Sequence, residues 1–250
     1  MGLQVKRREI FLLLFFFLVF SCATVAQIYA EVQYTRSFTV TITVEKSFLG
    51  IFTWTEDQKK TVTATVSDKD YRYWRSERQR RWYRPHYYWW SYWDDYKWLV
   101  QAGAKHSAIK SIVTQLRAFN LNDEDYVNAV LQIVHQFTYE AGLPPKFAIE
   151  TIVDRTADCD GFSVFVATIL KASGYQVALI EYRAEEHMVV GVHLDEPPRK
   201  MIRTEYAYYF TKNGVTYYIC ETTGQGAEST WRVGECPEDL RGHSAYVIVI

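Results

Sequence analysis

The sequence predicts an α+β fold in which helices come first and an antiparallel sheet follows. Between residues 109 and 173, apolar side chains recur at helical spacing in three segments. Between residues 176 and 250, strand-like runs follow one another along the chain. Helices followed by consecutive strands are typical of α+β proteins, whose neighbouring strands pair in antiparallel fashion.

Length and charge limit the possible architectures and partners. A chain of 250 residues is long enough for one domain with a substantial core and an N-terminal extension. We expect a leader over residues 1–30, an extension over residues 31–100 and a main domain over residues 101–250. The net charge of −1 points neither to nucleic acid nor to an anionic membrane surface, so no nucleic-acid partner is expected.

The leader reads as a targeting or anchoring segment. Basic residues at positions 6–8 precede 21 uncharged residues, 10–30. This length matches the roughly 20 residues that span a bilayer and exceeds the ~7–15 of a usual signal-peptide core. An uncleaved anchor is therefore plausible, while Ala26 and Ala30 are compatible with a signal peptide and Cys22 with a lipoprotein site. Each alternative makes the rest of the chain extracellular, either secreted or held at the cell surface through residues 10–30.

Three cysteines lie in the exported part of the chain, Cys159, Cys220 and Cys236. An oxidising compartment favours pairing of two of them and leaves one thiol free. A short segment that contains glycine joins Cys220 to Cys236, so a bond between these two, with Cys159 free, is one arrangement. A bond between Cys159 and either of the others is another.

The extension is predicted to begin with a β-hairpin. Apolar residues alternate with threonines over residues 32–44, the pattern returns over residues 61–66, and the apolar segment 48–52 lies between them. The next stretch, Tyr71–Trp98, interleaves aromatic residues with six arginines and predicts no clear secondary structure. It is compatible with a platform that binds sugars, peptides or anions. It is also compatible with a collar packed over the main domain, or with a segment near a membrane interface.

Three helices are predicted in the main domain. The first spans residues 109–116, and the second follows Asn122, a good N-cap, and ends near Val134. Two consecutive prolines then force an extended connection. The third helix covers residues 158–173, with Gly174 placed as its C-terminal stop.

Five strands are predicted after the third helix. The dipeptide Asn213-Gly214 between two of them is a strong hairpin signal. The predicted strands cover residues 176–182, 187–193, 205–211, 215–220 and 246–250.

Cys159 lies in the first turn of the helix that begins at Asp158. Free backbone N–H groups there favour a thiolate and would stabilise an oxyanion, although a small buried core cysteine explains the position equally well. A catalytic thiol needs a base and a group that orients the base. His187 opens one strand and Glu221 follows another, but strand periodicity alone does not separate His187 from His193.

Several ordered motifs resemble the transglutaminase-like superfamily, in particular its archaeal exported members with cysteine protease domains. The segment IETIVDRTADCDGFSVFVATILKASGY, residues 149–175, looks like the nucleophile region of that family. Residues 187–192 are similar to the family's His-bearing strand, and residues 217–223 to its acid-bearing strand. Residues 231–235 resemble the family's closing segment, and residues 133–139 the helix end that precedes its core. Together the motifs cover about residues 123–237.

This resemblance implies a papain- or transglutaminase-like core, in which the helix that bears the nucleophile packs on an antiparallel sheet. It implies a catalytic domain over residues 101–250 and a triad of Cys159 as nucleophile, His187 as base and Glu221 as orienting acid. Such an enzyme acts on amide or peptide bonds of a protein or peptide through an acyl-enzyme, with no cofactor. Hydrolysis is favoured over protein-glutamine acyl transfer, and a non-catalytic cell-surface binding module is the alternative on the same fold.

The chain departs from the family pattern at three positions. Ala157 stands where glycine is common, Glu221 where aspartate is common, and Gly161 where an acidic or small polar residue is common. None of these changes removes a catalytic group. The aspartates near the third helix resemble a calcium loop, but Thr156 occupies the first ligand position and Ala167 the closing one. No zinc-binding spacing of Cys or His occurs in the sequence, so no metal is expected.

Overall fold

The structure is a computed structural model that describes residues 31–48, 51–82, 92–142, 144–224 and 230–250. The predicted leader lies outside these residues. Within them, no helix combines the length and the apolar character that crossing a bilayer requires.

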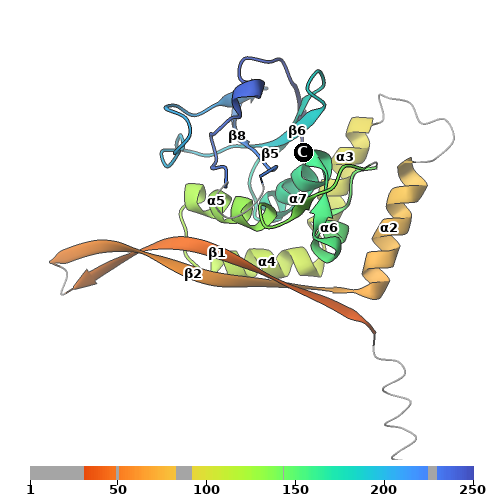
Figure 1. The fold of residues 1–250 in the computed structure, drawn as a ribbon, viewed down its shortest axis with the longest axis horizontal. Coiled ribbons are helices and arrows are strands. Elements are labelled where there is room, and N and C mark those ends of the chain that lie inside the picture. Colours follow the sequence, from red (N-terminus) through yellow and green to blue (C-terminus); the bar gives the residue numbers. More distant parts are fainter. Residues whose placement is uncertain (1–30, 49–50, 83–91, 143, 225–229) are drawn as a thin grey trace, which may run out of the picture.

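A long β-hairpin forms one side of the molecule (Figure 1). Strands β1 (Gln33–Phe48) and β2 (Phe52–Ser67) pair in antiparallel fashion along their whole length. Phe38, Val40 and Ile42 are buried on one face, and the threonines between them are exposed on the other. The predicted hairpin is confirmed, and β2 is longer than the segment 61–66 because its pairing with β1 continues to the turn.

The Arg- and aromatic-rich stretch contains two helices, α2 (Asp68–Trp82) and α3 (Tyr92–Gly103). Trp74 of α2 and Trp98 of α3 both pack on the buried ring of Phe147, with ring centroids 4.7 and 5.2 Å from it. The guanidinium of Arg81 lies 3.5 Å from the centre of the Trp98 ring. In the part that the structure describes, this stretch has the packing expected of a collar.

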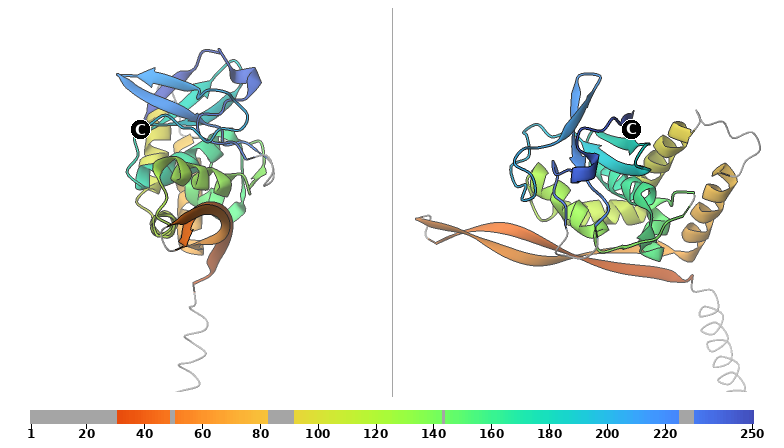
Figure 2. Two further views of the ribbon diagram at one scale, coloured as in Figure 1. Left: turned by 90° about the vertical axis from the view of Figure 1, so that its left-hand side faces the viewer. Right: turned by 45° about the horizontal axis from the view of Figure 1, so that its top comes forward.

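Helix α7 (Cys159–Ala172) runs through the centre of the fold, and nearly all of its residues are buried. Helices α3, α4, α5 and α6 pack against it, and α4 and α5 also lie along the hairpin (Figures 1 and 2). The three predicted helices are confirmed. They correspond to α4 (Ser107–Arg117), α5 (Asp123–Val134) and α7, and α6 (Ala148–Asp154) is an additional short helix.

Two glutamine side chains, Gln132 of α5 and Gln136 just after this helix, hold the free edge of β1. Gln132 accepts a hydrogen bond from the backbone N–H of Thr41 at 2.7 Å and donates one to its carbonyl at 3.0 Å. Gln136 makes the same pair of bonds with Thr39, at 3.0 and 2.8 Å. These amides satisfy backbone groups as a neighbouring strand would, so they fix the register of the hairpin on the helix.

The main sheet is antiparallel and has the strand order β7-β8-β6-β5-β9. Asn213 and Gly214 have φ of 53° and 77°, as a tight hairpin between β7 and β8 requires, so that prediction is confirmed. The five strands are β5 (Val177–Tyr182), β6 (His187–Val192), β7 (Tyr209–Lys212), β8 (Val215–Cys220) and β9 (Tyr246–Val249). The mixture of helices and antiparallel strands agrees with the predicted α+β class.

Two details of the strands differ from the prediction. The strand predicted at 205–211 begins only at Tyr209, because the N–H of Tyr208 donates to the carbonyl of Gly234 at 2.8 Å. Two short segments, β3 (Thr138–Tyr139) and β4 (Thr156–Ala157), pair in parallel and were not predicted.

The sheet separates two hydrophobic clusters. The larger cluster joins the hairpin, the helices and the inner face of the sheet, and the smaller one covers the outer face. Cys220 belongs to the first cluster and Cys236 to the second. The bond between Cys220 and Cys236, one of the arrangements that the sequence left open, is not formed, and all three described thiols, including that of Cys159, are free.

Candidate active site

Cys159 is the first residue of α7, as predicted. Asp158 precedes the helix in an extended conformation, and its side chain accepts a hydrogen bond from the backbone N–H of Gly161 at 2.8 Å. Burial, the largest cause, raises the pKa of Asp158 to about 6 against the effect of this bond. The N-cap and the pairing of β4 with β3 just before it set where the helix begins, and so where the thiol points.

Gly161 fits this start of α7 because Ala157 leaves no room for a side chain there. A Cβ atom on Gly161 would lie 2.7 Å from the Cβ of Ala157 and 3.3 Å from the backbone nitrogen of Lys146. Two of the three departures noted in the sequence, Ala157 and Gly161, are thus linked in space. Because Ala157 carries a methyl group, position 161 has no room for a Cβ atom.

His187 and Glu221 meet because β6 and β8 are antiparallel neighbours. β6 starts at His187, and β8 ends one residue before Glu221, so the two side chains lie at the same end of the sheet. Nε2 of His187 lies 2.9 Å from Oε2 of Glu221. His193 lies at the opposite end of β6, where its Nδ1 is 3.0 Å from the carbonyl of Thr216. The structure therefore distinguishes the two histidines that periodicity left equal.

The thiol of Cys159 lies beside His187. It is 7% exposed, and its Sγ is 3.6 Å from Oδ1 of Asp160 and 3.8 Å from the carbonyl of Glu186. Burial acts to lower the pKa of His187, but hydrogen bonds with Cys159 and Glu221, together with their negative charges, raise it to about 10. Because Nε2 contacts Glu221, Nδ1 is the ring nitrogen left to face the thiol.

Glu221 is held from several sides. It is 1% exposed, and its Oε1 accepts hydrogen bonds from the backbone N–H and the hydroxyl of Thr223, both at 2.6 Å. Its backbone carbonyl lies 3.1 Å from Nε2 of His135. These contacts leave Oε2 directed at His187. An acid held in this way orients the imidazole ring and stabilises its charged form.

His135 is a neighbour of the site that the sequence analysis did not single out. It is buried, and burial, the largest cause, lowers its pKa to about 4, so the ring is neutral at pH 7. A neutral ring donates through Nε2 to the Glu221 carbonyl and supports the acid-bearing segment. The only signal in the sequence was its position in the segment 133–139, which resembles the family's helix end.

Ser163 connects the three elements that carry the site. It lies one turn after Cys159 on α7 and is fully buried. Its hydroxyl donates to the carbonyl of Met188 at 2.9 Å and lies 3.1 Å from the hydroxyl of Thr222. Met188 follows His187 and Thr222 follows Glu221, so one side chain links the helix of the thiol to both partner segments.

Two tyrosines also belong to the surroundings of the thiol and were not predicted. The hydroxyl of Tyr96, on α3, donates to Oδ2 of Asp160 and ties the aromatic collar to the start of α7. The pKa of Tyr139 is raised, first by burial and then by the negative charges of Cys159, Asp158 and Asp160. Its side chain is 43% exposed and lies at the solvent side of the site.

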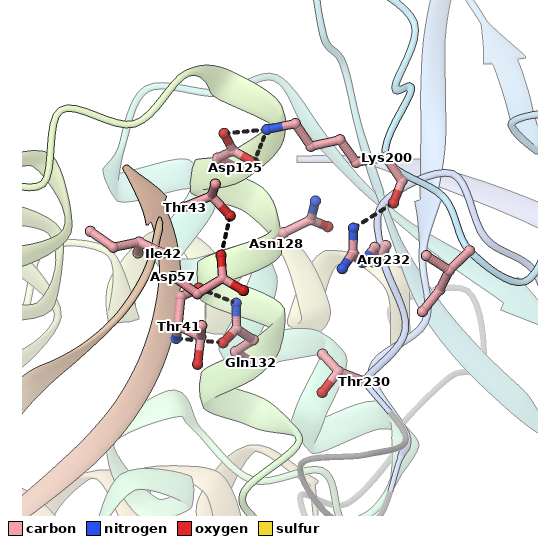
Figure 3. Close-up of a pocket in the computed structure, with 11 residues that line it drawn as sticks. Thr41, Ile42, Thr43, Asp57, Asp125, Asn128, Gln132, Lys200, Thr230 and Arg232 are labelled. Carbon is pink, nitrogen blue, oxygen red and sulfur yellow. Dashed lines mark hydrogen bonds and ion pairs between the residues drawn. The ribbon is translucent and has the colours of Figure 1, made fainter. Parts of the chain in front are cut away.

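A polar cleft of about 310 Å³ adjoins the segment before Cys159. Asp158 and Ala157 form one wall, and charged side chains of α2 and of the loop before α6 form others, including Arg75, Arg78 and Lys146. A second polar cleft lies between the hairpin, α5 and the segments around Lys200 and Arg232 (Figure 3). None of the three predicted site residues lines either cleft, but the first cleft is bounded by Asp158, the residue directly before Cys159.

Among the described residues, no group of three or more His, Cys, Asp or Glu side chains is arranged to hold a metal ion. The chain matches no protein-family model, no curated protein and no solved structure.

Proposed function

We propose that the chain is an exported thiol enzyme that acts on amide or peptide bonds, with Cys159 as nucleophile, His187 as base and Glu221 as orienting acid. The observation that carries this proposal is the position of the His187 ring between a buried carboxylate and a thiol at a helix N-terminus. The order of motifs in the sequence, which resembles the transglutaminase-like superfamily and its papain-like core, supports the same roles.

The chemistry follows from these positions. The thiolate of Cys159 attacks the carbonyl carbon, and the oxyanion forms near the backbone N–H groups at the start of α7. The imidazolium of His187 gives its proton to the leaving amine as the C–N bond breaks, which leaves a thioester on Cys159. Water, deprotonated by His187, then attacks the thioester carbon. The C–S bond breaks, the carboxylic acid leaves, and the thiolate of Cys159 is regenerated beside the imidazolium of His187.

Hydrolysis, by a cysteine protease or an amidase, is the outcome that we favour over transfer to an amine. The side chain of His187 is 19% exposed and Tyr139 at the edge of the site is 43% exposed, so water reaches the acyl-enzyme. Acyl transfer, as in cross-linking at protein glutamines, needs the same three residues and an amine that outcompetes water. We place the enzyme outside the cytoplasm on the strength of the uncharged leader segment 10–30.

A peptide library tests the proposal without knowledge of the substrate. The full chain and its Cys159→Ala variant are incubated with the library and a small primary amine, and new peptide ends and amine adducts are identified by mass spectrometry. Cys236→Ala is the matched control, because it removes a thiol on the other face of the sheet. We expect new ends with the wild type and Cys236→Ala but not with Cys159→Ala.

The other outcomes are also decisive. Amine adducts that depend on Cys159 without new ends would identify an acyltransferase. Activity retained by Cys159→Ala would exclude the thiol mechanism. An inactive wild type whose Cys159 also resists alkylation would favour the binding module.

A further inference from the structure

Four large apolar side chains are exposed at the end of the β1–β2 hairpin. Phe48, Ile51, Phe52 and Trp54 are 61, 74, 68 and 47% exposed. The backbone N–H of Ile51 donates to the carbonyl of Phe48 at 3.1 Å, so these residues belong to one turn and its flanking pairs. We call these four residues the apolar tip. Neighbouring exposed apolar residues of this kind mark an interaction site rather than random variation of the surface.

The apolar tip projects away from the rest of the molecule. In Figures 1 and 2 the described helices and the main sheet lie on one side of the hairpin, and the end of the hairpin extends beyond them. The segment that carries the buried residues Phe38 to Ile42 packs on α5, whereas the end of the hairpin extends past α5 and the other described helices. The tip is therefore convex and accessible from several directions.

Charged residues follow directly behind the apolar tip. Lys46 and Glu56 form an ion pair across the hairpin. Further along the hairpin, the negative charges of the exposed Glu45 and Asp57 are balanced by the positive charges of the exposed Lys59 and the half-buried Lys60. On β2 the apolar surface ends with Trp54 and on β1 with Phe48, because the charged Lys46 pairs with Trp54. The tip thus spans about three residue pairs, or roughly 10 Å at ~3.4 Å per residue.

We propose that the apolar tip inserts into the interfacial region of a lipid bilayer. Trp and Phe side chains favour the boundary between headgroups and acyl chains, and Ile favours the acyl region. A depth of about 10 Å suits shallow insertion of this kind. The charged residues behind the tip stop it at the headgroups, and because their charges balance, insertion needs no anionic lipid.

A protein partner fits the tip less well than a bilayer does. A stable protein interface buries about 800 Å² on each side and involves some 20–30 residues, whereas the tip offers four large side chains on a convex turn. A second copy of the chain would have to receive them in an apolar groove. The two clefts described above, including the one in Figure 3, are instead lined mainly by polar and charged groups.

The other end of the hairpin explains why so small a patch suffices. The described chain starts at the base of the hairpin, directly after the segment 10–30, which is long enough for the uncleaved anchor that the sequence allows. The sixteen residues of β1 span about 50 Å. An anchor at one end of the hairpin holds the protein at the bilayer, so binding of the apolar tip is a second, effectively intramolecular contact. The effective concentration of the tip at the bilayer is therefore high. Two contacts far apart would fix how the body is oriented on the membrane. This inference rests on the proposed location outside the cytoplasm and on an uncleaved segment 10–30, and it is independent of the thiol chemistry.

Photo-crosslinking to lipid tests the proposal. The full chain with Phe52→p-benzoylphenylalanine is reconstituted in vesicles of phosphatidylcholine, with or without phosphatidylglycerol, and irradiated. The matched control carries the probe at Tyr209, an aromatic residue of β7 that is 57% exposed against 68% for Phe52. We expect a lipid adduct at position 52, absent at position 209 and independent of phosphatidylglycerol. An added Ile51→Asp substitution should reduce the adduct at least about fivefold.

Each other result overturns the proposal. An adduct between two protein chains at position 52 would show a second copy as the occupant. Equal lipid adducts at both positions would mean general proximity to the membrane, and no adduct in chains that float with the vesicles would exclude insertion. Alkylation of Cys159 is measured in the same samples, so failure of the tip is distinguished from failure of the proposed enzyme.

Discussion

Nε2 of His187 lies 2.9 Å from Oε2 of Glu221, and this contact joins the start of β6 to the residue after β8. The carboxylate is buried and its other oxygen is occupied by Thr223. The ring is therefore held in one orientation and is favoured as a cation, with the thiol of Cys159 on its other side. The reactivity of Cys159 should depend on this pair.

Replacing His187 by alanine should slow alkylation of Cys159 by iodoacetamide at pH 6 at least about tenfold, because a neighbouring cation favours the reactive thiolate. Labelling of the Cys159 peptide is followed by mass spectrometry. The matched control is His193→Ala, at the other end of the same strand, which should leave the rate unchanged. Equal rates in the wild type and both variants would mean that the ring does not activate the thiol.

The raised pKa of His187 also predicts how stability depends on pH. The folded pKa is about 10 and the unfolded value about 6.5, so the contribution of the imidazolium is complete below pH ~6.5 and is lost as the pH rises towards ~10. In denaturant unfolding, the wild type should lose stability across this window, and His187→Gln should show a flatter profile. Parallel profiles for the two proteins would contradict the raised pKa.

Much of the fold follows from local sequence signals. Asn122 acts as the predicted N-cap, and Asp158, where the third helix was predicted to begin, is the N-cap of α7. Their side chains accept hydrogen bonds of 2.9 and 2.8 Å from the third N–H of each helix. The alternation around Phe38 and Val40 correctly predicts which face of the hairpin is buried. The relative positions of Cys159, His187 and Glu221 required the resemblance, because local patterns do not say which strands are neighbours.

Helix α2 escaped prediction for a physical reason. Its inward positions include Tyr71, Trp74, Arg78, Arg81 and Trp82, which have helical spacing, but two of them are arginines. Arg78 occupies an inward position because a buried carboxylate, Glu150, lies opposite it. A pattern of apolar residues cannot reveal a position that a distant charge makes favourable. Helix α6 was missed because six of its seven residues are buried, so it shows no alternation between apolar and polar faces.

Ser163 should position the site rather than only stabilise the core. Ser163→Ala removes the bond to the Met188 carbonyl and leaves that buried group unpaired, which should cost about 1–3 kcal/mol. If the hydroxyl also fixes His187 and Glu221 relative to the thiol, the substitution should shift the pH profile of Cys159 alkylation. The profile is measured well below the melting temperature of the variant, where the protein is folded. Thr222→Val, which removes only the bond between the two hydroxyls, should have a smaller effect. An unchanged profile in a destabilised Ser163→Ala variant would assign the residue a purely structural role.

The contact between positions 157 and 161 predicts compensation. Gly161→Ala places a Cβ 2.7 Å from that of Ala157, and such overpacking typically costs 1–3 kcal/mol, which exceeds the ~1 kcal/mol that alanine gains over glycine in a helix. Adding Ala157→Gly removes the clash. The double variant should therefore be more stable in denaturant unfolding than Gly161→Ala alone. If Ala157→Gly destabilises both backgrounds equally, the two positions are not coupled.

The last prediction concerns the ion pair that fixes α2 on the body. Nε of Arg78 lies 3.0 Å from Oε1 of Glu150, whose side chain is fully buried, whereas the Arg80–Glu77 pair on the same helix is largely exposed on its arginine side. Arg78→Ala should cost about 3–5 kcal/mol because it leaves a buried charge without its partner. The matched control, Arg80→Ala, should cost less than about 1 kcal/mol.

The size of that loss should also depend on pH. Burial, the largest cause, already raises the pKa of Glu150, and Arg78 opposes this effect. Without the arginine the folded pKa rises further above the unfolded value, so the Arg78→Ala variant binds an extra proton in the folded state. The difference in free energy of unfolding between the wild type and Arg78→Ala should therefore become smaller as the pH falls. Adding Glu150→Gln to Arg78→Ala should reduce this difference at pH 7 as well. A deficit that neither acid nor Glu150→Gln reduces would mean that Arg78 acts through packing of its side chain and not through its charge.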